Sequence, residues 1–326
     1  QNRPWQGETV GGGEERVSLP AFVPDCYLCP GNARVSGRRN EAYESVFVFD
    51  NDHPCVGPAA PDPAPPTSGL YRSRRANGLS RVVCYSPRHD LTLAELAHHE
   101  VVHLLETLQD QHRDLMGRPD VQHVLMFENK GAITGVSNPH PHCQIYATNF
   151  VFRSMEVEAD ASVRHLAEHG RPLFRDIIVE EEKDGRRLVS RRGDAVAFVP
   201  YFARYPYETF VAPRETHANI AELSPGELGD LASVLQEVVV RMDNLWRMSF
   251  PYVMVLHQAP ASVNTRGSGF HFYIQILPPL RKPGLLKYLA GPEIGGGNLP
   301  NGTAPENTAG EWRAVPEAHY RAAVHG

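Results

Sequence analysis

Two histidines and a glutamine alternate along one short segment, Pro139-His-Pro-His-Cys-Gln-Ile-Tyr146. In a β-strand, residues two apart face the same side, so His140, His142 and Gln144 are expected to line one surface. A neutral imidazole is a good nucleophile toward phosphorus near neutral pH, because its ordinary pKa is about 6.5. Its attack would give a phosphoramidate intermediate, which divides one transfer into two displacements.

The groups beside these histidines suit the binding and transfer of a phosphate. The preceding loop, Asn129-Lys-Gly-Ala-Ile-Thr-Gly-Val-Ser137, offers small residues, backbone N–H groups and a hydroxyl. Successive backbone N–H groups can form a concave anion site. Gln144 would donate to a phosphoryl oxygen without supplying a proton to the leaving group. A third histidine in its place could act as a general acid and would favour hydrolysis by water.

The elements that would position this site occur twice in the same order. The first set is a strand at 81–86, a helix behind the capping box Thr92-Leu-Ala-Glu95, and strands at 121–129 and 139–146. The second set is a strand at 209–214, a helix behind Ser224-Pro-Gly-Glu227, and strands at 252–257 and 270–275. Four elements repeated in one order predict two copies of one α+β unit.

We therefore expect an α+β fold of two duplicated halves, mostly antiparallel sheets with helices packed on one face. The halves would divide into residues 1–165 and 166–326. When the copies are aligned on Gln144 and Gln275, His140 matches His271 but His142 is replaced by Tyr273. If one histidine does chemistry, it is therefore His142, and the second half keeps the scaffold without it.

Composition and charge exclude several classes of protein. Hydrophobic residues make up 41% of the chain, charged residues 21%, and the formal net charge is −6. That balance argues against non-specific nucleic-acid binding, which depends on Lys and Arg. No run approaches the ~18 apolar residues of a membrane span, and the N-terminal segment lacks the apolar region of a secretory signal. Five cysteines make a disulfide framework improbable, so we expect a soluble, cytoplasmic protein.

Cys26 and Cys29 form a single Cys-x-x-Cys pair, a half-site with the tight spacing that zinc favours. Because no second such pair occurs, any further ligands would have to be histidines far along the chain. A redox pair and two ordinary loop cysteines remain alternatives at this point. The other three cysteines, Cys55, Cys84 and Cys143, are expected to be loop or core residues.

The segment from Asn129 to Gln144 closely resembles the active-site signature of the galactose-1-phosphate uridylyltransferases, a branch of the histidine-triad superfamily. Further blocks resemble the family in family order: Arg3-Pro-Trp-Gln-Gly7, Cys26-Tyr-Leu-Cys-Pro-Gly-Asn32, Phe49-Asp-Asn-Asp52, Tyr85-Ser-Pro-Arg-His89 and Tyr207-Glu-Thr-Phe210. The resemblance implies histidine-triad-like halves and a ping-pong enzyme. His142 would take UMP from UDP-glucose and pass it to a hexose 1-phosphate, which is galactose 1-phosphate in the family.

The same resemblance implies the substrate-binding residues and the assembly. Gln144 and Ser137 would bind phosphoryl oxygens. Uridine and ribose would be held by Leu28, Val35, Asn51, Asp52 and Asn129. The C-terminal segment would bind the hexose phosphate through Lys287, Tyr288 and Glu293. The family precedent is a homodimer with sites near the subunit interface, where Arg3 would approach the phosphates.

A structural zinc ion is also implied by the resemblance. Family members that bind zinc supply two ligands from the positions matching His89 and His140. Together with Cys26 and Cys29 these make a Cys2His2 set, which would hold His140 rigid and so position the strand that bears His142.

Some family members carry a second, iron-like site built from one glutamate and three histidines. Glu158 and His257 match two of those positions, but Tyr273 and Gln275 stand where the other histidines would be. We therefore expect the second site to be absent.

The match weakens in the segment that would bind the hexose. Pro292 precedes Glu293 in place of an aromatic residue, and the glycine-rich run that follows suggests a remodelled loop. Cys143 also replaces a family glycine, and its side chain should face away from His142. Alternatives are a nucleotide-sugar or dinucleoside-polyphosphate phosphorylase, a transferase for another base or hexose 1-phosphate, and a zinc-bearing binding module without catalysis.

Overall fold

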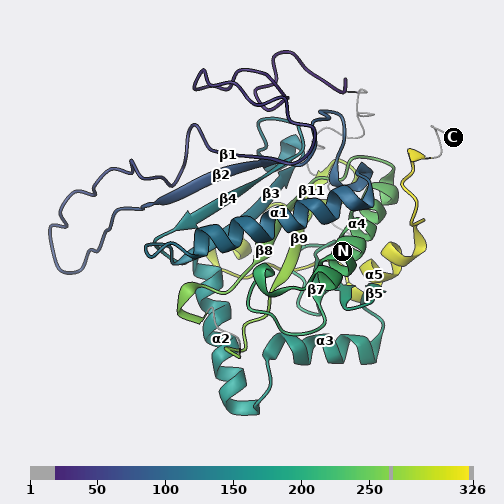
Figure 1. Ribbon diagram of the computed structural model, residues 1–326. Coiled ribbons are helices and arrows are strands. Elements are labelled where there is room, and N and C mark those ends of the chain that lie inside the picture. Colours follow the sequence, from purple (N-terminus) through teal and green to yellow (C-terminus); the bar gives the residue numbers. More distant parts are fainter. Residues whose placement is uncertain (1–18, 264–266, 323–326) are drawn as a thin grey trace.

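One sheet of nine strands runs through both halves of the chain (Figure 1). This computed structural model describes residues 19–263 and 267–322. Every neighbouring pair of strands in the sheet is antiparallel. The strands are Phe47–Asp50 (β1), Gly78–Cys84 (β2), His123–Lys130 (β3), His142–Thr148 (β4), Leu188–Arg192 (β5), Ala195–Phe198 (β6), Thr209–Pro213 (β7), Tyr252–His257 (β8) and Tyr273–Leu277 (β9).

The order of the strands shows the duplication directly. Across the sheet they run β1-β2-β4-β3-β8-β9-β7-β6-β5. The sequence pairs β2 with β7, β3 with β8 and β4 with β9, so the second half repeats the first in reverse order. The halves meet where β3 pairs with β8, its own counterpart. The predicted α+β fold of two duplicated, antiparallel halves is confirmed.

Two long helices cover one face of this sheet, helix α1 (His98–Met116) and helix α4 (Pro225–Trp246). Their apolar residues share one core with the strand residues below them, including Leu104, Leu235 and Ile145. The N-terminus of α4 is the predicted capping box. The backbone N–H of Ser224 donates to the Glu227 carboxylate at 2.8 Å, and the Glu227 N–H donates to the Ser224 hydroxyl at 3.3 Å.

Helix α1 begins later than its capping box predicts. The Thr92 N–H does donate to the Glu95 carboxylate at 3.1 Å, but the box closes only a 3₁₀ turn, Leu93–Glu95. Leu96 and Ala97 are then extended, which breaks the helix, and α1 starts at His98. Its own cap is the Glu100 carboxylate, which accepts from the Ala97 N–H at 2.7 Å.

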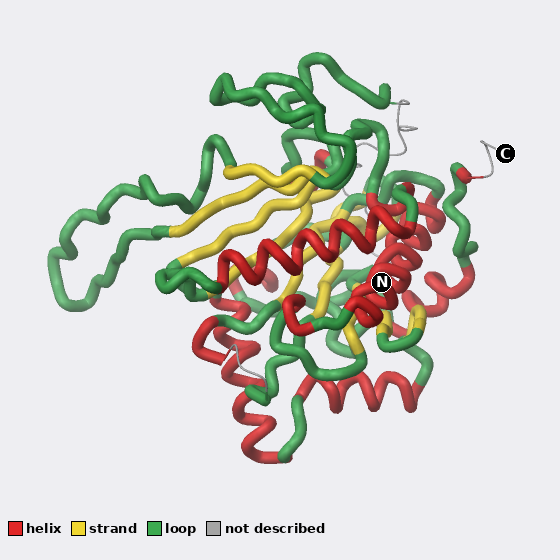
Figure 2. Tube along the Cα trace, viewed as in Figure 1, coloured by secondary structure: helices red, strands yellow, loops and turns green. Residues whose placement is uncertain are grey.

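The opposite face is covered differently in the two halves. Over the second half lie helix α2 (Arg153–His169) and helix α3 (Leu173–Asp184), with Ile178 packed against Phe198 and Tyr273. In the first half a non-helical segment takes their place, and its Cys26 and Cys29 pack on Val82 and Cys84 (Figure 2). Around β2 and β4, the first half therefore keeps a part of the sheet face that no helix of the described residues covers.

The C-terminal part adds β10 (Leu280–Lys282), β11 (Leu285–Leu286), a short π-helical turn (Gly291–Gly295) and helix α5 (Pro305–Ala314). Trp312 of α5 is fully buried, and its indole N–H donates to the Thr209 hydroxyl at 3.2 Å. This contact attaches the end of the chain to β7. Within the described ranges, no helix combines the length and apolar character needed to cross a membrane.

Candidate active site and metal centre

The uncovered face of the first half carries the histidine motif. His142 opens strand β4 opposite Cys84, and Gln144 lies opposite Val82. Because side chains alternate along a strand, His142 and Gln144 share the face on which the segment around Cys26 packs. His140 precedes the strand and turns into that segment, where it is buried.

The ring of His142 has a defined tautomer. Its Nδ1 lies 2.8 Å from the backbone carbonyl oxygen of His140. A carbonyl oxygen can only accept, so Nδ1 carries the proton and the lone pair is on Nε2. Burial lowers the pKa of His142 below its ordinary value, which keeps the ring neutral. The site thus holds a neutral imidazole. Its Nδ1–H is held by the His140 carbonyl oxygen, and its Nε2 lone pair is available as a nucleophile.

Gln144 is oriented by a residue that the sequence analysis missed. The Tyr146 hydroxyl donates to Gln144 Oε1 at 3.5 Å, which leaves the amide N–H groups of Gln144 as donors. Tyr146 also packs edge-on against Phe127, with ring centroids 5.0 Å apart. Because side chains alternate strictly along β3 and β4, both rings lie on the sheet face that carries His142 and Gln144. The alternation of residues in the sequence could therefore have identified Phe127 and Tyr146.

The loop before the motif is built around two glycines. Gly131 and Gly135 have φ values of 92° and 83°, a region that residues with a side chain rarely adopt. Between them runs a 3₁₀ turn, Ala132–Thr134. Ser137 follows on the surface, with its hydroxyl 3.2 Å from the Tyr27 hydroxyl. The loop therefore brings the predicted phosphate-binding serine against the segment that carries the cysteines.

The residues predicted to bind uridine and ribose come from three places. Leu28 is buried beside the cysteines, whereas Val35 is 65% exposed on the following turn. Asn51 and Asp52 directly follow β1, and the Asp52 carboxylate accepts from the Ser36 N–H at 3.4 Å. Asn129 lies on β3, two residues beyond Phe127 and on the same face of the sheet.

The predicted hexose-binding residues follow β11, beside the second half of the nine-stranded sheet. Lys287 Nζ is 3.6 Å from the Glu293 carboxylate and 5.9 Å from the centre of the Tyr205 ring, just before β7. Strands β4 and β7 are separated by β3, β8 and β9, which puts them roughly 19 Å apart at ~4.8 Å per strand. The contacts of Lys287 are with residues beside β7 and β9, not with residues of β4. Tyr288 belongs to the same segment, and Arg3 is outside the described residues.

The four predicted zinc ligands form one buried cluster. One ligand atom from each of Cys26, Cys29, His89 and His140 lies within 4.8 Å of all the others. Cys29 Sγ is 3.7 Å from Nδ1 of His89 and 3.6 Å from Nδ1 of His140. The other ring nitrogen of His140 lies 2.9 Å from the Ser86 carbonyl oxygen, an outer contact typical of histidines that bind metals.

The chemistry of this cluster fits a metal ion. Burial raises the pKa of the Cys29 thiol to about 11 and lowers the pKa of His140 to about 4. A buried cation would reverse the first shift by binding thiolates, and the second already favours the neutral imidazole that a metal needs. Two thiolates and two imidazoles are a donor set typical of structural zinc. The chain thus has a buried Cys2His2 cluster able to bind a metal.

The residues at the second, iron-like position do not fit a metal. Nδ1 of His257 is 3.0 Å from both oxygens of the Glu158 carboxylate, and its Nε2 is 2.8 Å from Gln275 Oε1. Gln275 in turn donates to the Glu208 carboxylate at 2.6 Å, and Tyr273 stacks on the His257 ring at 4.3 Å. Only Glu158 and His257 are metal-ligating side chains here, and Gln275 and Tyr273 take up the other ring nitrogen and the ring face of His257.

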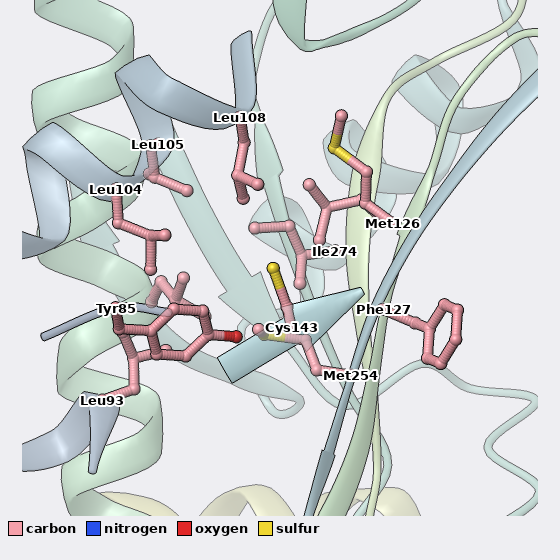
Figure 3. Close-up of a pocket in the computed structure, with 12 residues that line it drawn as sticks. Tyr85, Leu93, Leu104, Leu105, Leu108, Met126, Phe127, Cys143, Met254 and Ile274 are labelled. Carbon is pink, nitrogen blue, oxygen red and sulfur yellow. The ribbon is translucent and has the colours of Figure 1, made fainter. Parts of the chain in front are cut away.

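Behind the histidine strand lies an apolar cavity, which is distinct from the site. Cys143 points into it together with Leu105, Leu108 and Ile274, whereas Phe127 points to the other side (Figure 3). Cys143 is 3% exposed, and burial raises the pKa of its thiol above the ordinary value. Its side chain therefore faces away from His142, into a cavity lined mostly by apolar side chains.

Duplicated α+β halves with a single His-Pro-His-x-Gln strand define a protein of the histidine-triad superfamily. Two family models match the chain. "Galactose-1-phosphate uridyl transferase, N-terminal domain" covers residues 1–151, and "Galactose-1-phosphate uridyl transferase, C-terminal domain" covers residues 158–324. The chain belongs to this family and is a transferase.

Individual relatives agree with this assignment. The chain is 36% identical to a galactose-1-phosphate uridylyltransferase of Haemophilus influenzae, over 98% of this chain and 90% of the relative. It is 35% identical to the enzyme of that name from Rattus norvegicus, over 98% and 83% of the two chains. A solved uridylyltransferase structure superimposes with a TM-score of 0.81 at 31% identity and covers 96% of each chain.

Proposed function

We propose that this protein transfers UMP from UDP-glucose to galactose 1-phosphate through a uridylyl-histidine at His142. The observation that carries the proposal is the ring of His142, whose Nδ1–H is held by the His140 carbonyl at 2.8 Å. Nε2 is thereby the nucleophilic atom. Membership of the uridyl transferase family supports the choice of uridine and of hexose 1-phosphates.

In the first step Nε2 of His142 attacks the α-phosphorus of UDP-glucose. A P–N bond forms, the bond from that phosphorus to the bridging oxygen breaks, and glucose 1-phosphate leaves with the bonding electrons. The ring then carries the uridylyl group on Nε2 and its proton on Nδ1. The His140 carbonyl stabilises the positive charge that develops on the ring. Because this dipole is already fixed in place, no reorganisation is needed during the reaction.

In the second step a phosphate oxygen of galactose 1-phosphate attacks the same phosphorus and breaks the P–N bond. UDP-galactose leaves and His142 returns to the neutral form. Gln144 and Ser137 donate hydrogen bonds to the phosphoryl oxygens in both steps. Neither is an acid of the strength that would protonate a leaving oxygen, which favours exchange between phosphates over hydrolysis.

The nucleoside pocket would lie between the turn at 33–39, the end of β1 and the edge of β3. Its members would be Leu28, Val35, Asn51, Asp52 and Asn129. The buried Cys2His2 cluster would hold zinc in a closed, structural role, because all four positions of a tetrahedral ion are taken by protein ligands. The metal would tie the Cys26 segment to the residue before β4 and so position His142.

We also propose that the working unit is a homodimer. Lys287, Tyr288 and Glu293 are about four strand spacings from His142 within one chain, too far to contact the same substrate. A second copy related by a two-fold axis would bring its hexose-binding segment to this His142 and receive the same in return. In this arrangement residues 1–165 supply the nucleophile and the zinc site, and residues 166–326 supply the hexose-binding segment.

A cytoplasmic location fits the chemistry of the cysteines. All five are free thiols, and two of them belong to the metal cluster. Thiols are kept reduced in the cytoplasm, whereas an oxidising compartment would compete with the metal for them.

An exchange assay tests the activity. Each mixture contains the protein, UDP-glucose and one acceptor. The acceptors are galactose 1-phosphate in the first mixture, and other hexose 1-phosphates or inorganic phosphate in the rest. We expect UDP-galactose and glucose 1-phosphate from the first mixture. Turnover that requires inorganic phosphate and ignores sugar phosphates would instead indicate a phosphorylase.

A complementation assay tests the dimer. A His142→Gly variant and a Glu293→Ala variant are each expected to be nearly inactive. After subunit exchange, mixed dimers would contain one site with both residues intact, so equal amounts should recover about a quarter of wild-type activity. If no activity returns although mixed dimers form, each site is complete within one chain.

A further inference from the structure

Arg34 is a buried cation with few partners of its own. Its side chain is 9% exposed, and its Nε and Nη1 atoms have no hydrogen-bond partner among the described residues. Burial of a guanidinium is costly unless another charge or an aromatic face compensates it. The contacts that Arg34 does make therefore indicate its role.

Both compensating contacts come from the end of strand β1. The guanidinium carbon lies 4.3 Å from the centre of the Phe49 ring, a cation–π contact. Nε lies 3.6 Å from the Asp52 carboxylate, whose side chain is 10% exposed. Because both charges are shielded from water, their attraction is stronger than that of a surface ion pair.

The backbone around Arg34 forms a closed turn. The Arg34 N–H donates to the Arg38 carbonyl at 2.7 Å, and the Gly37 N–H donates to the Arg34 carbonyl at 2.9 Å. From the same turn, the Ser36 N–H donates to the Asp52 carboxylate at 3.4 Å. Asp52 is thus held from two points of one turn, and that turn also presents Val35 to the surface.

We infer that Arg34 is a positioning residue for the nucleoside pocket, which it closes by fixing the Asp52 carboxylate against the turn that carries Val35. The inference rests on the proposed function, in which Asp52 binds the ribose. With Arg34 in place the carboxylate stays fixed, with its oxygens ready to accept hydrogen bonds from ribose hydroxyls. Without it the carboxylate would be free to rotate, and affinity and selectivity for ribose would fall together.

The test uses the first half-reaction of the full-length protein, uridylylation by UDP-glucose alone. We compare Arg34→Met, which keeps the apolar stem but removes the charge, with Arg38→Met, an exposed arginine on the same turn. Arg34→Met should raise the half-saturating UDP-glucose concentration about tenfold, with less than about a threefold change in the limiting rate. Arg38→Met should match the wild type.

Selectivity separates positioning from a general loss of stability. The preference for UDP-glucose over its 2′-deoxyribose and 3′-deoxyribose analogues should fall about tenfold in Arg34→Met for at least one analogue. Asp52→Asn should cause a similar fall, and the double variant should lose little more than either single variant. Arg34→Lys keeps the charge and should restore part of the selectivity. This variant also provides the test if Arg34→Met does not fold.

The failures of the two proposals are distinguishable. Two results would overturn this role for Arg34 if the wild type still forms the adduct. One is normal saturation by UDP-glucose in both Arg34→Met and Arg34→Lys. The other is weakened UDP-glucose binding with unchanged selectivity against both analogues. A wild-type protein that forms no adduct at all overturns the proposed function and this inference together.

Discussion

At the scale of single residues, the account depends on which atoms can donate and which can only accept. The His140 carbonyl fixes the proton of His142 on Nδ1, and the Tyr146 hydroxyl occupies the oxygen of Gln144. The site therefore presents one nucleophilic nitrogen and one amide donor. At the corresponding place in the second half, Nε2 of His257 contacts the Gln275 amide oxygen, so a glutamine stands where a further metal ligand would be needed. Hydrogen-bond geometry thus assigns different roles to the two halves.

Replacing Gln144 with histidine should convert transfer into hydrolysis. An imidazolium at this position could protonate the leaving phosphate and, when neutral, activate water, effects typically worth 10²–10⁴ in rate. We expect Gln144→His to raise release of free UMP from UDP-glucose by about 10²-fold and to lower UDP-galactose formation. The neighbouring Cys143→Ala, whose side chain faces the core, should leave the ratio of the two products unchanged. Equal ratios in both variants would contradict the role given to Gln144.

At the scale of elements, packing on the two faces of the sheet buries two histidines that the chemistry does not use, one on α1 and one beside Phe152. His112 of α1 is 2% exposed and His123 of β3 is fully buried. Desolvation lowers the pKa of His112 to about 3 and that of His123 to about 4. One ring nitrogen of each has no hydrogen-bond partner within the part of the chain that the structure describes. Both rings must therefore stay neutral in the folded protein.

The fold should lose stability in acid because of these two residues. In the unfolded chain each histidine binds a proton below about pH 6.5, whereas the folded protein does not until about pH 3–4. Stability is therefore fully present above pH 6.5 and is lost as the pH falls below it, by about 1.4 kcal/mol per histidine at pH 5.5.

Urea unfolding at pH 7.5 and pH 5.5 measures this loss. The variant His112→Leu should lose about 1.4 kcal/mol less than the wild type between the two pH values. The control His98→Gln removes an exposed histidine from the same helix and should follow the wild type. Identical pH dependence in all three proteins would refute the assignment of a buried, neutral His112.

At the scale of the whole molecule, a single metal would connect segments far apart in the chain. Cys26 and Cys29 precede β1, His89 follows β2 and His140 precedes β4. We expect about one zinc per chain in the wild type, and Cys29→Ser should lose the metal and more than about 3 kcal/mol of stability. Cys55→Ser changes an exposed cysteine outside the cluster and should retain both. Metal analysis and urea unfolding of the three proteins decide the point.

The sequence predicted the strands of the repeated unit and the duplication because their signals are local, whereas β5 and β6 were not predicted. The alternation in β4, the capping box before α4 and the repeated order of elements each lie within a few residues. Helices α2 and α3 were missed. The buried face of α2 packs on Ala218, Ala259 and Phe270, and that of α3 packs on Phe198, Phe210 and Tyr273, contacts that form only in the folded chain. The late start of α1 also followed from tertiary packing, which extends Leu96 and Ala97 after the predicted cap.

Some residues of the candidate site could likewise be predicted from the sequence, and others could not. The four candidate metal ligands and His142 were predictable from motif and resemblance, and the structure brings the four side chains together. Tyr146, Phe127 and Arg34 were not identified, because their roles depend on strands and turns that meet only in the folded chain. The residues predicted to bind the hexose contact Tyr205, just before β7, and β7 is four strands from β4, a separation that no spacing in the sequence reveals.

The most direct test of the account is to look for the covalent intermediate. The protein is mixed with UDP-glucose alone, quenched in base, digested and examined by mass spectrometry. We predict a stoichiometric, acid-labile UMP adduct on the peptide that contains His142, with one glucose 1-phosphate released per adduct. An active enzyme with no such adduct, or His142→Gly with full turnover, would contradict the central claim.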